Sequence, residues 1–279
     1  MAVCSGLILA VAVLPSLDAM AASRASGTTV PAPGPRIALY GDSLVSEAGP
    51  EFAALGQLSG ASVRVHTFPG TSPCDYFSSM SSAAQGWHPT VALLAFSGNT
   101  FTACDDGVQA GTPSYYAKYK DEIRTAISIF RSVGAKVILV GLPADASARL
   151  TRNGRALNQL YRSLAQASPG VTFDDAGRAV TTKGRFTWRL PCLSGEPCTG
   201  PHGTNTVRAP DGVHFCPVEK AAAAGIIGPC PVYSSGAYRY ALAMVGALTV
   251  PPGGHGNMAP CPGCPSATRL RPIPATSSG

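Results

Sequence analysis

Short apolar runs alternate along the chain with longer segments of helical periodicity, and this alternation restricts the fold more than any other feature. Residues 90–96 (TVALLAF) and 136–140 (KVILV) are continuously apolar, as in strands buried on both faces. Between them, residues 113–133 repeat apolar side chains along one helical face. Strands that alternate with helices predict a parallel sheet covered on both faces. The expected strands are 36–40, 62–68, 90–96, 136–140 and 171–173, and the expected helices are 45–58, 113–133, 151–167, 217–224 and 237–248.

Residues 178–210 depart from this pattern, because they are rich in Gly, Pro and Cys and show no periodicity. An ordered loop of such length usually carries function or is cross-linked. The whole chain of 279 residues is 45% hydrophobic, enough for one sizeable core. Its net charge of +6 comes from Lys and Arg residues scattered along the sequence. Without a basic stripe, nucleic acid is not an expected partner.

The N-terminus and the cysteines together predict export. Residues 6–15 (GLILAVAVLP) form an apolar run too short to span a membrane, and Ala19-Met20-Ala21 is typical of a cleavage site. No Lys or Arg precedes this run, so a buried helix is the alternative. Of nine cysteines, eight lie outside this segment, an even set that suits disulfides in an oxidising compartment. We expect a signal peptide at 1–21, a flexible linker at 22–35, a folded domain at 36–250 and a Pro/Gly-rich tail at 251–279. The expected location is secreted or at the cell envelope, without a transmembrane anchor.

Polar or glycine residues follow each of the first three expected strands. Ser43 follows the first strand, Gly70 the second and Asn99 the third, while His214 lies in the last loop before the C-terminal helix. In open parallel sheets, ligands bind beyond the carboxyl ends of the strands. We therefore expect these residues at one edge of the sheet.

These residue types match the needs of nucleophilic catalysis by serine. A serine hydroxyl needs a base, the base needs an orienting carboxylate, and the transition state needs donors for its oxyanion. Asp211 precedes His214 by three residues, so one turn could bring its carboxylate to the ring. Each residue alone also has an ordinary explanation: Ser43 as a helix cap, Asp211 and Asn99 as turn residues, and His214 as a surface side chain.

The combination of Gly41-Asp42-Ser43-Leu44, Gly70, Gly98-Asn99 and Asp211-x-x-His214 resembles the SGNH (GDSL-type) hydrolases over residues 36–248. The resemblance implies a flavodoxin-like three-layer α/β/α sandwich with a central parallel sheet of about five strands. It also implies hydrolysis or transfer of acyl groups, with no cofactor. By position, Ser43 would be the nucleophile, His214 the general base and acid, and Asp211 the residue that orients it. The N–H groups of Ser43 and Gly70 and the side chain of Asn99 would form the oxyanion hole, and Asp42 would be structural.

The third block departs from the family pattern. The family commonly has Gly-x-Asn-Asp, whereas this chain has Ser97-Gly98-Asn99-Thr100. The glycine is shifted by one position and the final Asp is Thr100. The donor Asn99 is kept, so we retain its assignment.

Eight cysteines allow 105 sets of pairs, and from proximity we expect three particular disulfides. Cys74 lies four residues after Gly70 and Cys104 five after Asn99, so a Cys74–Cys104 bridge would join the two oxyanion-hole loops. We further expect Cys192–Cys198 in segment 178–210 and Cys216–Cys230 beside His214, and a tail disulfide for the remaining pair, Cys261 and Cys264. A zinc site built from His202, His214, Cys216 and Cys230 is the other interpretation, but the spacing does not follow the usual ligand patterns. We therefore expect no metal.

Three functions remain open for this sequence. The first is a serine esterase that forms an acyl-enzyme on Ser43. The second is an acyltransferase that uses the same triad to place a short or medium acyl chain on a saccharide hydroxyl, as in exported actinobacterial-type relatives with similar Ala/Gly/Pro-rich composition. The third is a non-catalytic carbohydrate-binding module, which would not need the intact set of Ser43, Asp211 and His214. The expected partner is a small-molecule ester or acylated saccharide, and we expect a monomer.

Overall fold

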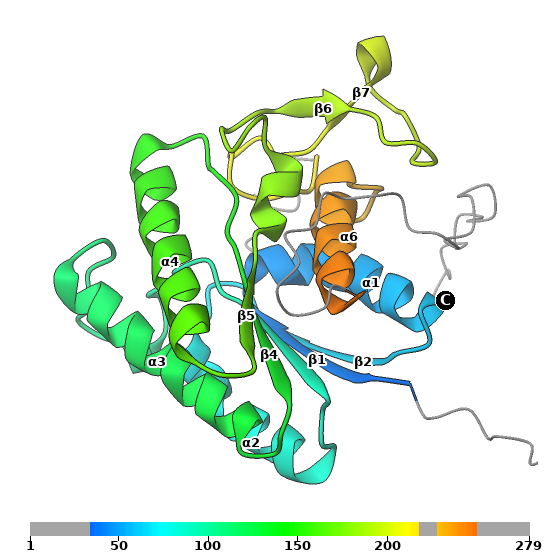
Figure 1. Ribbon diagram of the computed structural model, residues 1–279. Coiled ribbons are helices and arrows are strands. Elements are labelled where there is room, and N and C mark those ends of the chain that lie inside the picture. Colours follow the sequence, from blue (N-terminus) through cyan, green and yellow to red (C-terminus); the bar gives the residue numbers. More distant parts are fainter. Residues whose placement is uncertain (1–33, 218–227, 250–279) are drawn as a thin grey trace, which may run out of the picture. The chain divides into compact units, whose positions relative to one another are not determined.

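The structure is a computed structural model that describes residues 34–217 and 228–249 (Figure 1). The expected signal peptide, most of the linker, the tail with Cys261 and Cys264, and all but the first residue of the expected helix 217–224 lie outside these residues. The expectations for those segments, and the domain boundaries built on them, stay predictions. Among the described helices, none has both the length and the apolar character needed to cross a membrane.

Five parallel strands form the central sheet, and every strand expected from the sequence is present. Their order across the sheet is β2 (Ser62–Thr67), β1 (Arg36–Gly41), β3 (Val91–Ala95), β4 (Lys136–Val140) and β5 (Val171–Asp174). Strand β1 lies between β2 and β3, so the loops that follow these three strands leave the same edge side by side. The predicted fold class is therefore confirmed.

Alternate side chains of each strand face opposite helical layers. Ile37 and Leu39 belong to the core beneath α1 (Ser43–Leu58) and α6 (Ser235–Thr249). Ala38 and Tyr40 belong to the core beneath the helices of the other layer. That layer consists of α2 (Phe77–Gly86), α3 (Pro113–Arg131) and α4 (Ala148–Ala167) (Figure 1). The sheet is covered on both faces, which explains why its inner strands β1, β3 and β4 are almost wholly buried.

The helix boundaries follow local signals, except in one case. Helix α3 begins after Thr112, whose side chain accepts a hydrogen bond from the Tyr115 N–H, and Pro113 occupies its first turn. Helix α2 was not expected, because its sequence, FSSMSSAAQG, has few large apolar residues. It buries only Met80, Ala83 and Ala84, so packing against the sheet rather than sequence periodicity determines it.

Segment 178–210 is ordered, with little regular structure. It contains most of the 3₁₀ helix η3 (Ala176–Val180), then a small antiparallel pair, β6 (Arg189–Pro191) and β7 (Thr204–Thr206), and the short turn η4 (Pro201–Gly203). The buried carboxylate of Glu196 fastens the segment to α6. It pairs with Arg239 and accepts hydrogen bonds from Ser235 at 2.9 Å and from Tyr233 at 2.8 Å.

Candidate active site

Ser43 lies at the junction of β1 and α1, at the carboxyl edge of the sheet. The strand ends at Gly41, and Asp42 caps the helix by accepting a hydrogen bond from the Leu44 N–H at 3.2 Å. Ser43 is the first residue of the helix, where backbone N–H groups have no acceptor within the helix. Its own N–H and hydroxyl are therefore placed at a positive helix terminus.

A chain of hydrogen bonds connects Ser43 to His214 and Asp211. The Ser43 hydroxyl lies 2.9 Å from His214 Nε2, and His214 Nδ1 lies 2.6 Å from Asp211 Oδ2. The second oxygen of Asp211 accepts hydrogen bonds from the N–H groups of Val213 at 2.8 Å and His214 at 3.0 Å. Gly212 has a φ of +72°, which closes the turn between the two side chains and favours glycine. The structure thus brings together the three residues that the sequence identified.

The ionisation of Asp211 and His214 depends on their contact with each other. Partial burial alone would raise the pKa of Asp211, but the hydrogen bonds from His214 and the backbone lower it well below its usual range. Burial alone would lower the pKa of His214, but its hydrogen bond to Asp211 and the nearby carboxylates, Glu47 first among them, raise it above 6.5. Asp211 is therefore a carboxylate that stabilises the positive imidazolium a general base becomes.

Two buried charged residues that the sequence analysis did not identify hold the backbone on either side of His214. Arg208, 1% exposed, donates to the Val213 carbonyl at 2.9 Å and to the Ala144 carbonyl at 2.6 Å. Glu47, also 1% exposed, accepts a hydrogen bond from the Phe215 N–H at 2.6 Å. The residues before and after His214 are thus both fixed by charge-assisted hydrogen bonds.

Glu47 lies one helical turn after Ser43 on α1, so its hydrogen bond with Phe215 links the helix of Ser43 to the loop of His214. Burial raises its pKa to about 7, although the Phe215 N–H and the nearby His214 oppose the shift. A carboxylate on the buried face of α1, among Leu44, Val45 and Ala48, was the sequence signal that could have revealed it. Arg208 offered no comparable signal, since its partners are backbone carbonyls of distant residues.

Gly70 and Asn99 reach the same edge but differ in what their donors do. Within the described residues, the Gly70 N–H donates to no other group. The Asn99 amide nitrogen already has two acceptors, Asp42 Oδ2 at 3.1 Å and the Thr71 carbonyl at 3.3 Å. The expected oxyanion donor Asn99 is thus engaged with other acceptors in this structure.

Asp42 is the centre of a network that ties the β3 loop to β1. Its fully buried carboxylate accepts hydrogen bonds from the Ser97 N–H at 2.5 Å and the Ser97 hydroxyl at 2.6 Å, as well as from Asn99. Burial raises its pKa, and the Ser97 hydrogen bonds oppose that shift. Among the described residues, His214 forms its carboxylate hydrogen bond with Asp211 and not with Asp42, in keeping with the structural role that the resemblance implies for Asp42.

The described cysteines form the three pairs that the sequence analysis expected: Cys74–Cys104, Cys192–Cys198 and Cys216–Cys230. The first joins the loop after β2, which holds Gly70, to the loop after β3, which holds Asn99. The third follows His214 by two residues. Because Cys216 and Cys230 share a disulfide, they are not available as thiolate ligands for the alternative zinc site.

Exposed aromatic rings flank the triad on two sides. Phe101, 83% exposed, lies beside Gly70, 3.8 Å from the position a Cβ would take there. Trp188, 46% exposed, lies beside Gly212 at 3.5 Å by the same measure and packs edge-on against Phe186. Large exposed apolar rings at a site of converging polar groups are typical of ligand-binding surfaces.

Several solved structures are similar to this chain. The C-terminal catalytic domain of peptidoglycan O-acetyltransferase A from Streptococcus pneumoniae is 18% identical, with a TM-score of 0.47 over 78% of this chain and 94% of that one. A variant of the acetylxylan esterase Axe2 from Geobacillus stearothermophilus is 13% identical, with a TM-score of 0.42 over 52% of this chain and 78% of that one.

A comparison with curated proteins gave no match. A family of sequences described as a protein of unknown function, DUF459, matches residues 36–225. This range contains β1 to β7 and all three residues of the Ser43–His214–Asp211 chain. The chain belongs to the DUF459 family.

Proposed function

We propose that this protein is a serine esterase that cleaves acyl esters through an acyl-enzyme on Ser43. The observation that carries the proposal is the continuous chain from the Ser43 hydroxyl through His214 to Asp211, at 2.9 Å and 2.6 Å. The first distance is short enough for His214 to take the proton of Ser43, and the second is short enough for Asp211 to orient the imidazole ring. The resemblance of the four sequence blocks to SGNH hydrolases supports the same assignment.

The proposed reaction proceeds in two stages through these three residues. His214 Nε2 accepts the hydroxyl proton as Ser43 Oγ bonds to the ester carbonyl carbon, and the carbonyl oxygen becomes an oxyanion. Collapse of this intermediate breaks the bond to the alcohol, which leaves with the proton from His214. Water then attacks the acyl-enzyme, gives a proton to His214, and releases the acid as the proton returns to Ser43.

The oxyanion would be bound first by the N–H groups of Ser43 and Gly70. Ser43 N–H belongs to the first turn of α1, and Gly70 N–H has no other acceptor within the described residues. Asn99 would contribute only after its amide exchanges the Thr71 carbonyl or Asp42 for the oxyanion. Preorganised donors of this kind contribute about 3–4 kcal/mol each to the transition state.

Hydrolysis of p-nitrophenyl esters of increasing chain length tests the proposal. We expect activity in the wild type and a loss of about a thousandfold or more in Ser43→Ala, the loss typical of a missing triad nucleophile. Ser59→Ala is the matched control, because Ser59 caps the far end of α1 and its hydroxyl bonds only to the Leu55 carbonyl. Equal activity in the wild type and Ser43→Ala would contradict the proposal, and absence of activity in the wild type on any ester would favour the non-catalytic binding module.

A second candidate function, acyl transfer to a saccharide hydroxyl, is favoured by Phe101 and Trp188. Their exposed ring faces beside the triad could hold an acceptor against the acyl-enzyme in place of water. Product that forms only when a saccharide acceptor is added would favour transfer. In that case Trp188→Ala should restore hydrolysis at the expense of transfer, whereas Val232→Ala, at another exposed apolar side chain, should leave the ratio unchanged.

A further inference from the structure

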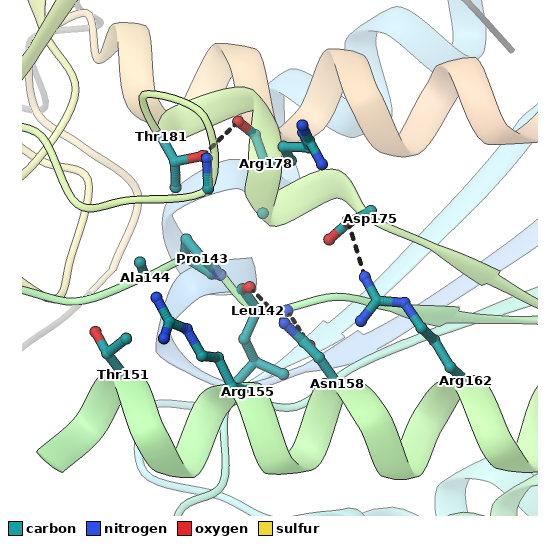
Figure 2. A pocket seen from close by; sticks show the side chains of 12 residues that line it. Leu142, Pro143, Ala144, Thr151, Arg155, Asn158, Arg162, Asp175, Arg178 and Thr181 are labelled. Carbon is teal, nitrogen blue, oxygen red and sulfur yellow. Dashed lines mark hydrogen bonds and ion pairs between the residues drawn. The ribbon is translucent and has the colours of Figure 1, made fainter. Parts of the chain in front are cut away.

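A second concave site lies beyond the β4–α4 loop, close to the triad. It is a cavity of about 180 Å³, which we call the arginine pocket. Helix α4 forms one wall with Arg155 and Arg162, and η3 forms the opposite wall with Arg178 (Figure 2). Leu142 to Ala144 form its floor. Nothing in the proposed reaction uses these arginines.

The walls of this pocket are fixed by buried backbone contacts. The buried Asn158 amide holds the Leu142 backbone in two directions, accepting from its N–H at 2.8 Å and donating to its carbonyl at 2.9 Å. Gly177 N–H donates to the Gly141 carbonyl at 3.0 Å. A Cβ on Gly177 would come within 2.3 Å of the Leu142 carbonyl carbon, so only glycine lets η3 approach so closely. The pocket is therefore preformed rather than dependent on a ligand.

Its charge is positive and largely unneutralised. Arg162 is held by an ion pair to Asp175 at 2.9 Å (Figure 2). It also lies over the Phe173 ring at 4.3 Å. Arg155 and Arg178 have no ion pair or side-chain hydrogen bond within the described part of the chain. Two guanidinium groups thus remain without a partner around one cavity, and each presents donors in a planar fork suited to phosphate or carboxylate.

Asp175, which pairs with Arg162, is the one acidic side chain among the residues that line the pocket. Helix α4 has four arginines and no Asp or Glu, and residues 176–189 have three further arginines and Lys183, again with no acidic residue. The sequence analysis found these cations scattered, but α4 and η3 bring the two segments to one pocket. Asp145, the carboxyl of the neighbouring loop, does not line the pocket.

Three hydrogen bonds connect the β4–α4 loop, which includes the pocket floor, to the loop of Asp211 and His214. Arg208 donates to the carbonyl of Ala144, which lines the pocket, and to that of Val213, which precedes His214. In addition, Ala146 N–H donates to the Gly212 carbonyl at 3.0 Å. A ligand group in the arginine pocket would therefore contact a loop that is hydrogen-bonded to the loop of Asp211 and His214.

We propose that the arginine pocket binds an oxyanion, a phosphate, sulfate or carboxylate group, carried by the natural ester or its acceptor. This proposal rests on the proposed function of the triad and specifies its substrate class as anionic. Arg155 and Arg178 make the direct contacts, and Arg162 remains paired with Asp175.

Ion binding tests the pocket without any need for catalysis. Ser43→Ala protein is titrated with inorganic phosphate, sulfate and glucuronate, and the arginine side-chain NMR signals are followed. We expect saturable shifts for at least one ion, and an affinity weakened by about tenfold or more when Arg155→Gln and Arg178→Gln are combined, as for lost charge-assisted hydrogen bonds. The Arg149→Gln/Arg152→Gln double variant is the matched control, because it also removes two positive charges, from positions of α4 that do not line the pocket. No saturable shift, or equal weakening by Arg149→Gln/Arg152→Gln, would overturn the proposal.

Kinetics with paired substrates separate this proposal from the proposed function. The Arg155→Gln/Arg178→Gln double variant should lower kcat/KM about tenfold for an acetylated sugar phosphate or acetylated uronate, whichever anion bound, and leave that of p-nitrophenyl acetate unchanged. Equal kcat/KM values for the anionic ester in wild type and double variant would contradict the anionic substrate. Ion binding in an enzyme with no activity on any ester would contradict the proposed function instead, and leave the pocket as an anion site.

Discussion

At the scale of the residue, the proposed mechanism makes His214 the group whose protonation decides activity. Its pKa is raised above 6.5 by Asp211 and Glu47, and a general base works only when neutral. We therefore expect kcat/KM to rise with pH, with a midpoint above the ordinary imidazole value. Asp211→Asn should move this midpoint down, because the main group that raises the pKa is removed. A pH–rate profile of both proteins measures the shift, and an unchanged or higher midpoint in Asp211→Asn would contradict the assignment.

The proposed roles of His214 and Asp211 predict losses of activity of different size when each is replaced. His214→Ala removes the proton acceptor and should cost about as much as Ser43→Ala. Asp211→Ala removes only the orienting carboxylate and should cost about ten- to a hundredfold less than His214→Ala. Single-turnover rates with a p-nitrophenyl ester provide the measurement.

Glu47 affects stability through its ionisation. Its folded pKa of about 7 lies above the ordinary 4.5, so it adds no cost to folding below pH 4.5. As pH rises from 4.5 through 7, ionisation of the unfolded chain destabilises the folded state by up to about 3 kcal/mol. Glu47→Gln should remove this dependence, because its amide oxygen can still accept the Phe215 N–H. Urea unfolding at pH 5 and 8 would show a smaller loss in the variant than in the wild type.

Glu47 also predicts a positioning effect that stability alone would not produce. Glu47→Ala leaves the Phe215 N–H without its acceptor, so His214 should be less well placed. We expect a lower kcat with little change in KM, and recovery in Glu47→Gln. A fall in Glu47→Gln as large as in Glu47→Ala would argue against a positioning role.

At the scale of the element, the Cys74–Cys104 disulfide joins two loops of the site across 30 residues. Replacing both cysteines by serine should lower the free energy of unfolding by about 3–4 kcal/mol, as expected from loop entropy. It should also lower kcat/KM, because the loops of Gly70 and Asn99 lose their covalent link. Replacing Cys192 and Cys198, which close only 6 residues, is the matched comparison. That variant should lose less stability, and urea unfolding with ester kinetics compares the two.

The elements also show where sequence patterns suffice. All five strands were predicted, 90–96 and 136–140 from continuous apolar runs typical of strands buried on both faces, and 62–68 from its alternation of apolar and polar residues. Helix α2 was missed because its small and polar residues carry no periodic signal. Its position depends on packing against the folded sheet, which a local sequence pattern does not contain. The same reasoning explains β6 and β7, whose three-residue strands depend on Glu196 and Arg239 rather than on their own pattern.

The candidate site likewise contains residues that could be predicted from the sequence and residues that could not. Ser43, Asp211 and His214 were identifiable because their chemistry constrains residue type and spacing, and the structure brings them together. The engagement of Asn99 was not identifiable, because its acceptors are Asp42 and the backbone of Thr71. Arg208 was missed for a similar reason, since a buried guanidinium bound to carbonyls leaves no acidic partner to find.

At the scale of the whole molecule, the charge distribution predicts salt dependence. The chain has a net charge of +6, and α4 and the segment after β5 concentrate cations around one cavity. Attraction of an anionic ester should weaken as ionic strength rises, because screening shortens the range of these charges. We expect kcat/KM for an anionic ester to fall between low and physiological salt while that for p-nitrophenyl acetate stays constant. Parallel falls for both substrates would mean that salt acts on the triad itself.

The hydrogen bond from Phe215 to Glu47 spans 168 residues, and it links the first catalytic element of the fold to the last. Because this bond sets the spacing of Ser43 and His214, the length of segment 178–210 does not have to. The tip of that segment, between Cys192 and Cys198, can therefore be treated as an exchangeable module, whereas Arg178 and Arg208 have to be kept. Replacing this tip with loops of other lengths should leave the hydrolysis of p-nitrophenyl acetate unchanged.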